Sequence, residues 1–378
     1  MNKLRIIFAG GGTGGHIYPI IAVSEKLRAW TEKNGVVADF RYFGNPGAFR
    51  EVLVANNIRV SRVAESKWRR YFSLLNFLDI FKFGFSIAQC LWKVYWFMPN
   101  VVFSKGGPGS LPVVLVSFFY GIPIVIHESD SVPGLANRLG SRFARVVELA
   151  FSSAAKHLPK TTAKLSVVGN PVRSELLSRT SPEQAKTELG FIPAKPLILI
   201  FGGSQGSNRM NDFIIGNLEA ILLKFQVLHV VGREKIKDYK NQYDFLTKNF
   251  SPILLANYKF LDYLGLEMSK AMDAADVIMA RGGAGAIFEI AAKGKPAIIV
   301  PFPEASADHQ KENGYAYALT GAAVVIEQEN LLPSIFLDQV EKIALDPAVK
   351  AKMSSAATAF YQADAADRIS VDILELIS

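Results

Sequence analysis

The sequence predicts two doubly wound α/β domains, each built on a parallel sheet with helices on both faces. Three observations lead to this prediction. The chain has 378 residues, more than one hydrophobic core usually supports. Its β-rich runs are continuously apolar, as at residues 197–200 and 298–300, which is typical of strands buried on both faces. These runs alternate with helical stretches in both halves of the chain.

The predicted strands form two sets. The first covers residues 4–9, 38–43, 101–104, 123–127, 146–152 and 165–168. The second covers residues 196–201, 227–231, 253–260, 277–280, 297–300 and 323–326. A turn-forming Gly-Asn-Pro cluster at 169–171 separates them, so we expect domains at 1–170 and 171–357. Two further helices are expected within about 347–377.

Composition limits the classes of function. Half of the residues are hydrophobic and a fifth are charged, which excludes a disordered chain. A single cysteine, Cys90, excludes a disulfide framework and a cysteine-based zinc site, and it fits a reducing compartment. We expect neither a secretory signal nor a membrane span, because the longest uncharged stretch, 106–126, contains seven Gly or Pro residues.

Charge is distributed unevenly along the chain. Residues 1–172 contain 21 Lys and Arg against 9 Asp and Glu, whereas residues 173–378 contain 21 against 25. A basic half favours an anionic partner such as nucleic acid or a membrane surface, although basic residues can also serve solubility alone.

Three glycine-rich turns each follow a predicted strand and precede a predicted helix. They are residues 10–15 before a helix from about 17, residues 202–206 before a helix over 208–224, and residues 281–285 before the helix that contains Glu289. Helix N-termini behind such turns favour phosphate, although the glycines can also serve tight turns alone. The first turn has the spacing neither of a Walker loop nor of a dinucleotide fingerprint, so ATP and NAD are weakly supported.

Four polar positions are candidates for chemistry. His16 lies at a helix start, where its pKa is lowered, and is either a base or a cap. The segment 127–130, His-Glu-Ser-Asp, is either general-base machinery or a polar turn. Glu289 can accept two hydroxyl groups of a ribose, or else it only complements a helix dipole. The segment 308–311, Asp-His-Gln-Lys, suits sugar hydroxyls or is an ordinary helix cap.

Residues 67–99 contain eleven aromatic residues, five Lys or Arg and one acid. This composition predicts a segment that packs one side in the core and presents its tip to a membrane surface. The residues expected at that tip are Trp68, Arg69, Arg70 and Phe72. Binding of single-stranded nucleic acid fits less well, because the apolar run is too continuous for a wet groove. We therefore expect no nucleic-acid partner.

Taken together, in their order and spacing, these motifs resemble the MurG family of peptidoglycan N-acetylglucosaminyltransferases over essentially the whole chain. The resemblance rests on residues 10–16, 127–128, 169–173, 202–206, 281–289 and 308–310. It implies a GT-B fold, in which two Rossmann-like domains face a cleft and the C-terminal helix, about 358–378, packs back on the first domain. It also implies a peripheral protein on the cytoplasmic side of the inner membrane, with other cell-wall synthesis proteins as further partners.

The resemblance implies an inverting transfer of N-acetylglucosamine from UDP-N-acetylglucosamine to the C4 hydroxyl of lipid I, undecaprenyl-diphospho-N-acetylmuramoyl-pentapeptide, without a metal or other cofactor. It assigns Glu289 to the ribose, Gln310 to the sugar hydroxyls, and Arg173 and Ser204 to the diphosphate region. Asp130 stands where the family usually has Asn. The remaining substrate contacts it implies are Thr13, Gly14, Gly15, Leu264, Ala284, Gly285, Ala286, Ile287 and Phe288.

The transfer requires a base for the acceptor hydroxyl. Our hypothesis is His16, with Glu128 as the competing candidate. No Asp-x-Asp pair and no cluster at metal-ligand spacing is evident, so no metal site is expected. Two related activities stay open as alternatives: transfer of a UDP-sugar to diacylglycerol, and 2-epimerisation of UDP-N-acetylglucosamine.

Overall fold

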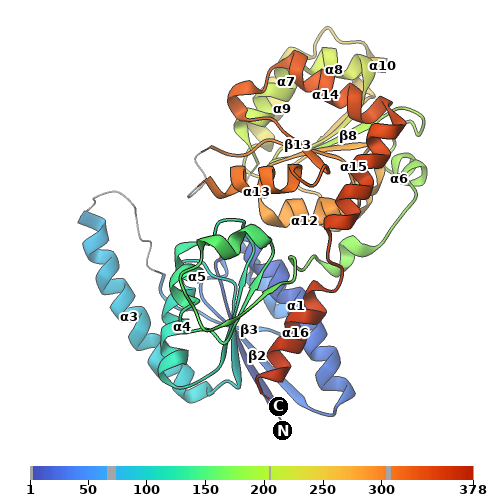
Figure 1. The fold of residues 1–378 in the computed structure, drawn as a ribbon. Coiled ribbons are helices and arrows are strands. Elements are labelled where there is room, and N and C mark those ends of the chain that lie inside the picture. Colours follow the sequence, from blue (N-terminus) through green and yellow to red (C-terminus); the bar gives the residue numbers. More distant parts are fainter. Residues whose placement is uncertain (1–2, 66–73, 204–205, 304–307, 378) are drawn as a thin grey trace. The chain divides into compact units, whose positions relative to one another are not determined.

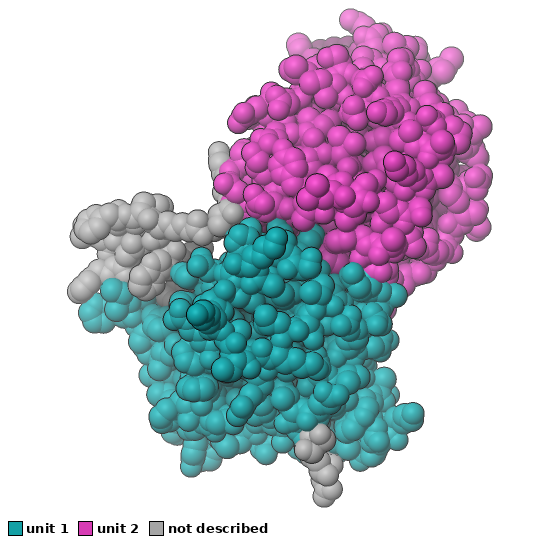
Figure 2. Space-filling model, in the orientation of Figure 1, with its two compact units in different colours: residues 1–173, 362–378 teal, residues 174–361 magenta. Residues whose placement is uncertain are grey.

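The computed structural model describes residues 3–65, 74–203, 206–303 and 308–377. The chain forms two compact units, residues 1–173 with 362–378 and residues 174–361 (Figure 2). The first unit therefore ends slightly later than the expected seam at 170/171. Each unit is an α/β layer structure on a parallel sheet (Figure 1), which confirms the predicted fold class.

The sheet of the first unit has seven parallel strands in the order β3-β2-β1-β4-β5-β6-β7. The central part of this order is that of a Rossmann fold, in which the chain reverses direction across the sheet between β1 and β4. The strands are β1 (Lys3–Ala9), β2 (Val37–Phe43), β3 (Arg59–Ser61), β4 (Val101–Ser104), β5 (Ile124–Glu128), β6 (Val146–Leu149) and β7 (Lys164–Val167).

Helices cover both faces of this sheet because β1 is apolar on both sides. Ile6 and Phe8 share one core cluster with α1 and α16, whereas Ile7 and Ala9 share the other with α3 and α4. The helices of the unit are α1 (Gly14–Lys33), α2 (Arg50–Ala55), α3 (Leu74–Phe97), α4 (Ser110–Phe119), α5 (Leu135–Gly140) and α16 (Ala365–Glu375), with short 3₁₀ turns η1 (Gly47–Phe49) and η2 (Ser152–His157).

The last helix, α16, belongs to the first unit although the chain reaches it from the second. Ile369 and Ile373 are fully buried in the core cluster that α1 also lines, and Figure 1 shows α16 beside α1. Residues 358–360, which we expected in this helix, end α15 instead.

The second unit repeats the arrangement with six parallel strands in the order β10-β9-β8-β11-β12-β13. Its reversal point lies between β8 and β11. The strands are β8 (Leu197–Phe201), β9 (Gln226–Val230), β10 (Tyr258–Leu261), β11 (Val277–Ala280), β12 (Ala297–Ile299) and β13 (Ala323–Val325). The helices are α6 (Pro182–Glu188), α7 (Asn208–Gly216), α8 (Leu218–Lys224), α9 (Ile236–Leu246), α10 (Pro252–Leu255), α11 (Met268–Ala274), α12 (Ala284–Ala292), α13 (His309–Ala318), α14 (Pro333–Leu345) and α15 (Pro347–Phe360).

Two local predictions were wrong, and one strand was missed. The strand expected at 253–260 begins only at Tyr258, because Ser251 caps a short helix that starts with Pro252. The helix expected over 208–224 is two helices that meet at Asn217. Strand β3 was not predicted, since its three residues are partly exposed and give no apolar run.

Candidate functional site

The first glycine-rich turn joins β1 to α1, at the reversal point of the first sheet. A Cβ atom on Gly12 would lie 2.6 Å from the carbonyl oxygen of Asn45, and one on Gly107 would lie 2.8 Å from the amide of Gly11. The loops that follow β1, β2 and β4 therefore meet backbone to backbone here. This close contact requires Gly12 and Gly107, because a side chain at either position would collide with the neighbouring backbone. Thr13 and Gly15 are exposed at the start of α1, where free amide groups favour an anion.

His16 lies in the first turn of α1 and is half-buried. Its Nδ1 shares a hydrogen bond of 2.8 Å with the hydroxyl of Thr13. Burial and the positive charge of Lys105 lower the pKa of His16 to about 4, although Asp130 acts in the opposite direction. The imidazole is therefore neutral near pH 7 and able to accept a proton.

Glu128 ends β5 and is fully engaged. One carboxylate oxygen accepts the amide of Asp130 at 2.9 Å, and the other accepts the amide of Gly134 and the Asn137 side chain at 3.1 and 2.9 Å. Burial raises the pKa of Glu128 to about 7, and the charge of Asp130 adds to this. These bonds shape the loop after β5 and position the candidate substrate contact Asp130.

A lysine that sequence analysis did not select lies at the centre of this site. Lys105 follows β4 and is 2% exposed. Its ammonium group donates to Nδ1 of His127 and to the hydroxyl of Ser129, and it lies 3.4 Å from Oδ1 of Asn170. Burial lowers the pKa of Lys105 to about 7 against the attraction of Glu128 and other carboxylates. Its position directly after an apolar strand is the one sequence signal it has, and this signal alone does not distinguish it from a solvated lysine.

His127 is held in one tautomer. Its Nε2 donates to the carbonyl oxygen of Gly169 at 2.8 Å, because that oxygen can only accept, and its Nδ1 therefore accepts from Lys105. Burial and the charge of Lys105 keep the pKa of His127 well below its usual value, although the hydrogen bond to the Gly169 carbonyl acts in the opposite direction. His127 is thus a neutral spacer between two strand ends, and not an available base.

Arg173 is the last predicted site residue of the first unit. Its guanidinium lies 4.4 Å from the centre of the Tyr18 ring, on the first turns of α1. The structure therefore brings Thr13, Gly14, Gly15, His16, Glu128, Asp130 and Arg173 together around the carboxyl ends of β1, β4 and β5.

In the second unit, the turn between β11 and α12 packs directly on the start of α13. A Cβ atom on Gly282 would lie only 2.0 Å from the carbonyl oxygen of Gln310. The side chain of Asn313 donates to the carbonyl of Gly282 at 3.1 Å, and the side-chain oxygen of Gln310 accepts the amide of Phe302 at 3.2 Å. The N-terminus of α12 and Gln310 are therefore fixed relative to each other.

The other predicted residues of this unit lie around the same sheet edge. Gly285, Ala286 and Glu289 are partly exposed near the N-terminus of α12. Ala284, Ile287 and Phe288 are buried, so any contact from them would come from the backbone or from packing. Leu264 is buried after β10, which β9 and β8 separate from β11. Ser204 lies outside the described residues.

Lys311, next to Gln310, is already paired. Its ammonium lies 2.8 Å from the carboxylate of Glu327, which also accepts the hydroxyl of Tyr315 at 2.6 Å. The carboxylate of Glu327 is therefore the partner of this lysine in the structure.

The outer surface of α3 and α4 is apolar. One side of α3 is buried through Cys90, Val94 and Phe97, which confirms the core-facing part of the prediction for residues 67–99. No helix of the described chain is long and apolar enough to cross a bilayer. Trp68, Arg69, Arg70 and Phe72 lie outside the described residues. The exposed apolar side chains of the two helices are Ile80, Phe81, Phe85, Trp92, Tyr95, Trp96, Phe118 and Phe119.

Within the described residues, no group of three or more His, Cys, Asp or Glu side chains is arranged to hold a metal ion.

Comparison with known families matches both units. Residues 6–148 match the glycosyltransferase family 28 N-terminal domain, and residues 197–369 match the C-terminal domain of that family. The chain is 36% identical over 344 residues to the UDP-N-acetylglucosamine–N-acetylmuramyl-(pentapeptide) pyrophosphoryl-undecaprenol N-acetylglucosamine transferase of Clostridium botulinum, with 90% of each chain covered. It is 35% identical over 361 residues to the enzyme of that name from Legionella pneumophila, with 93% of this chain and 94% of the other covered.

Solved structures show the same fold. MurG of Acinetobacter baumannii superimposes with a TM-score of 0.74 at 24% identity, covering 98% of this chain and 99% of the other. UDP-GlcNAc 2-epimerase from Neisseria meningitidis, bound to UDP-GlcNAc, superimposes with a TM-score of 0.64 at 15% identity, covering 98% and 100%. Because both identities are low, these similarities establish the fold and not the reaction.

Proposed function

The chain belongs to glycosyltransferase family 28 and, within it, to the family of UDP-N-acetylglucosamine–N-acetylmuramyl-(pentapeptide) pyrophosphoryl-undecaprenol N-acetylglucosamine transferases; from this premise we propose that it transfers N-acetylglucosamine from UDP-N-acetylglucosamine to the C4 hydroxyl of the muramoyl sugar of lipid I. The single observation that carries the proposal is full-length similarity to these transferases, over 90% or more of both chains. A candidate base in the first unit gives further support to the proposal.

The proposed base is His16. It must take the proton of the acceptor hydroxyl while the hydroxyl oxygen attacks C1 of the donor sugar, the bond from C1 to the UDP oxygen breaks, and the configuration at C1 inverts. Neutral His16 at an accessible helix start fits this role. Glu128 fits it less well, because both of its oxygens accept hydrogen bonds within the protein.

The donor is proposed to bind the second unit. Glu289 near the N-terminus of α12 would accept the ribose hydroxyls, and Gln310, oriented by Phe302, would bind the sugar. Leu264, Ser204 and residues 284–288 are proposed as further contacts. Arg281 adds a cation whose guanidinium lies 4.8 Å from the Phe302 ring centre, at the same turn.

Charge on the departing diphosphate needs stabilisation. Arg173 and the amide groups at the start of the glycine-rich helices are suitable donors for it. With Thr13, Gly14, Gly15 and Asp130 as acceptor-side contacts, we propose that these groups suffice without a metal ion or other cofactor. Transfer that continues in the presence of a chelator supports this part, and transfer that stops and returns with added Mg²⁺ refutes it.

Docking at a membrane surface is proposed to occur through α3 and α4. Their exposed aromatic side chains suit the boundary of a bilayer, where aromatic rings lie between the headgroups and the acyl chains. Trp68, Arg69, Arg70 and Phe72, which precede α3, are proposed as part of this surface. Because the proposed acceptor is a membrane lipid, we propose that the protein docks on the cytoplasmic face of the inner membrane.

Sedimentation with anionic vesicles tests the docking surface. Replacing Trp92 and Trp96 with Ser should reduce the bound fraction severalfold, because each ring is two-thirds exposed and loses its apolar contact area. Phe245→Ser, at an exposed ring of the second unit, is the matched control and should leave binding unchanged. Equal binding of all three proteins would place docking elsewhere.

A further inference from the structure

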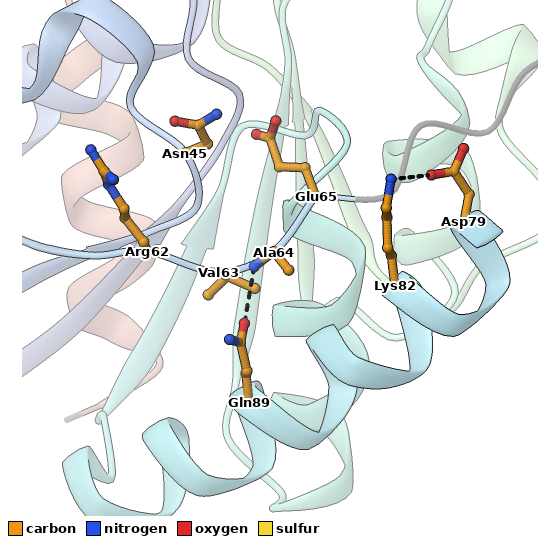
Figure 3. A pocket seen from close by; sticks show the side chains of 8 residues that line it. All are labelled: Asn45, Arg62, Val63, Ala64, Glu65, Asp79, Lys82 and Gln89. Carbon is orange, nitrogen blue, oxygen red and sulfur yellow. Dashed lines mark hydrogen bonds and ion pairs between the residues drawn. The ribbon is translucent and has the colours of Figure 1, made fainter. Parts of the chain in front are cut away.

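A cavity of about 710 Å³ opens beside the site in the first unit and is separate from the residues assigned above (Figure 3). It is formed by the loop after β2, the segment that follows β3, and α3. The lining residues are Asn45, Arg62, Val63, Ala64, Glu65, Asp79, Lys82 and Gln89.

Hydrogen bonds from side chains of α3 fix the backbone of the segment that follows β3 at one wall of this cavity. The side-chain oxygen of Gln89 accepts the amide of Ala64 at 3.0 Å, and the hydroxyl of Ser86 donates to the carbonyl of Ala64. Lys93 donates to the carbonyl of Arg62. Three side chains of α3 therefore hold the backbone of this segment, which leaves the side chains of Arg62 and Glu65 for the cavity.

The charges around the cavity are balanced. Two cations, Arg62 and Lys82, face two carboxylates, Glu65 and Asp79, and Figure 3 shows all four side chains extending to the same side of the ribbon. Lys82 pairs with Asp79 at 3.5 Å. Among the described residues, no ion pair or side-chain hydrogen bond engages Arg62 or Glu65. A ligand with both an amine and a carboxylate would satisfy both groups, whereas a diphosphate would be repelled by the carboxylates.

The cavity adjoins the first glycine-rich turn. A Cβ atom on Gly109 would lie 3.4 Å from Cγ of Glu65, and Asn45 contacts Gly12 through its backbone. Glu65 also lies close enough to Tyr42 to add to the rise of that hydroxyl's pKa, and Tyr42 donates to the carbonyl of Gly10 at 2.6 Å. A molecule whose sugar lies at this turn could therefore extend an arm into the cavity.

We propose that this cavity binds the peptide arm of the acceptor, with Glu65 pairing a free amino group of the peptide and Arg62 pairing a peptide carboxylate. The inference rests on the proposed function, in which the acceptor carries a pentapeptide. The cavity then contributes to selection of the acceptor and takes no part in the chemistry of transfer.

The test compares acceptors with and without the peptide arm, using the full chain and UDP-N-acetylglucosamine. Glu65→Gln and Arg62→Gln should each raise KM for the peptide-bearing acceptor by about tenfold, the effect of losing one charged hydrogen bond. Neither should change KM for the acceptor lacking the peptide or KM for the donor. Arg59→Gln, at an exposed arginine on β3, is the control and should change none of these values.

A second experiment tests whether Glu65 pairs with the free amino group of the peptide. Acetylating the free amine of the peptide should raise KM for the wild type, and Glu65→Gln should then have no additional effect. If Glu65→Gln and Arg62→Gln raised KM equally for both acceptors, or for neither, the proposed peptide subsite would be wrong, whereas the proposed transfer reaction would stand. Absence of transfer to either acceptor by the wild type would instead contradict the proposed function.

Discussion

Lys105→Met should move the acid limb of the transfer reaction to higher pH. The buried ammonium of Lys105 is one of the two causes that hold the pKa of His16 at about 4, and burial is the larger. A base must be unprotonated, so activity is present above the pKa of His16 and is lost as pH falls through it. Removing the cation raises that pKa, and the variant should therefore lose activity at a higher pH than the wild type.

The size of the shift is bounded by the structure. The pKa can rise from about 4 toward the ordinary value of 6.5 but not reach it, because burial remains. Because burial is the larger of the two causes, the charge of Lys105 accounts for the smaller part of the lowering from 6.5 to about 4. We therefore expect a displacement of about 1 pH unit, which corresponds to about 1.4 kcal/mol. Lys105 is protonated in this range, because its own pKa is about 7.

The assay is kcat against pH between about 4 and 7, combined with NMR titration of the His16 ring in the free protein. Lys33→Met makes the same substitution at an exposed position of α1 and should leave both curves unchanged. A thermal melt shows whether the Lys105 variant is folded. An acid limb and a His16 titration that stay in place, or move to lower pH, would refute the electrostatic reasoning.

Three further changes have defined outcomes. His16→Asn keeps a polar group near Thr13 but removes the base, so kcat should fall by about 10²–10⁴-fold, and near-normal turnover would eliminate His16 as the base. Gly282→Ala should weaken UDP-N-acetylglucosamine binding at least tenfold by calorimetry, because its Cβ would lie 2.0 Å from the Gln310 carbonyl; Gly283→Ala, whose Cβ meets nothing within 4 Å, should bind normally. Asp276→Asn should cost about 1.5–3 kcal/mol in urea unfolding, since it removes the carboxylate from buried Lys186, whose ammonium then keeps only the carbonyls of Pro193 and Lys195. Burial raises the pKa of Asp276, but its bonds to Lys186, Lys350 and an amide outweigh this and lower it, so the difference from wild type should shrink as pH falls below about 4.

Sequence patterns predicted most of the sheet because buried parallel strands are continuously apolar. Runs such as Val101–Ser104 and Val277–Ala280 therefore coincide with observed strands. Where local chemistry competes with the pattern, prediction failed: Pro252 behind the capping Ser251 begins a helix inside an apolar run. The three-residue strand β3 has no such run and is recognisable only by its pairing with β2.

The glycine-rich turns and His16 could be selected from sequence, since strand, glycines and helix follow one another locally. Lys105 could not be selected by the same reasoning, because a lone lysine is usually solvated. What makes it a central residue is its contact with His127, Ser129 and Asn170, which come from other loops and meet only in the folded sheet. Likewise, the competing assignment of Glu128 is weakened only by the hydrogen bonds that the fold supplies.

The central claim is the identity of the acceptor, and one measurement tests it most directly. Protein is incubated with labelled UDP-N-acetylglucosamine and three acceptor conditions: lipid-linked muramoyl-pentapeptide, diacylglycerol, and none. The proposed function predicts label on the muramoyl lipid alone, released by a β-specific hexosaminidase as expected for inversion. Label on diacylglycerol, or conversion of the donor sugar to its 2-epimer without any acceptor, would contradict it.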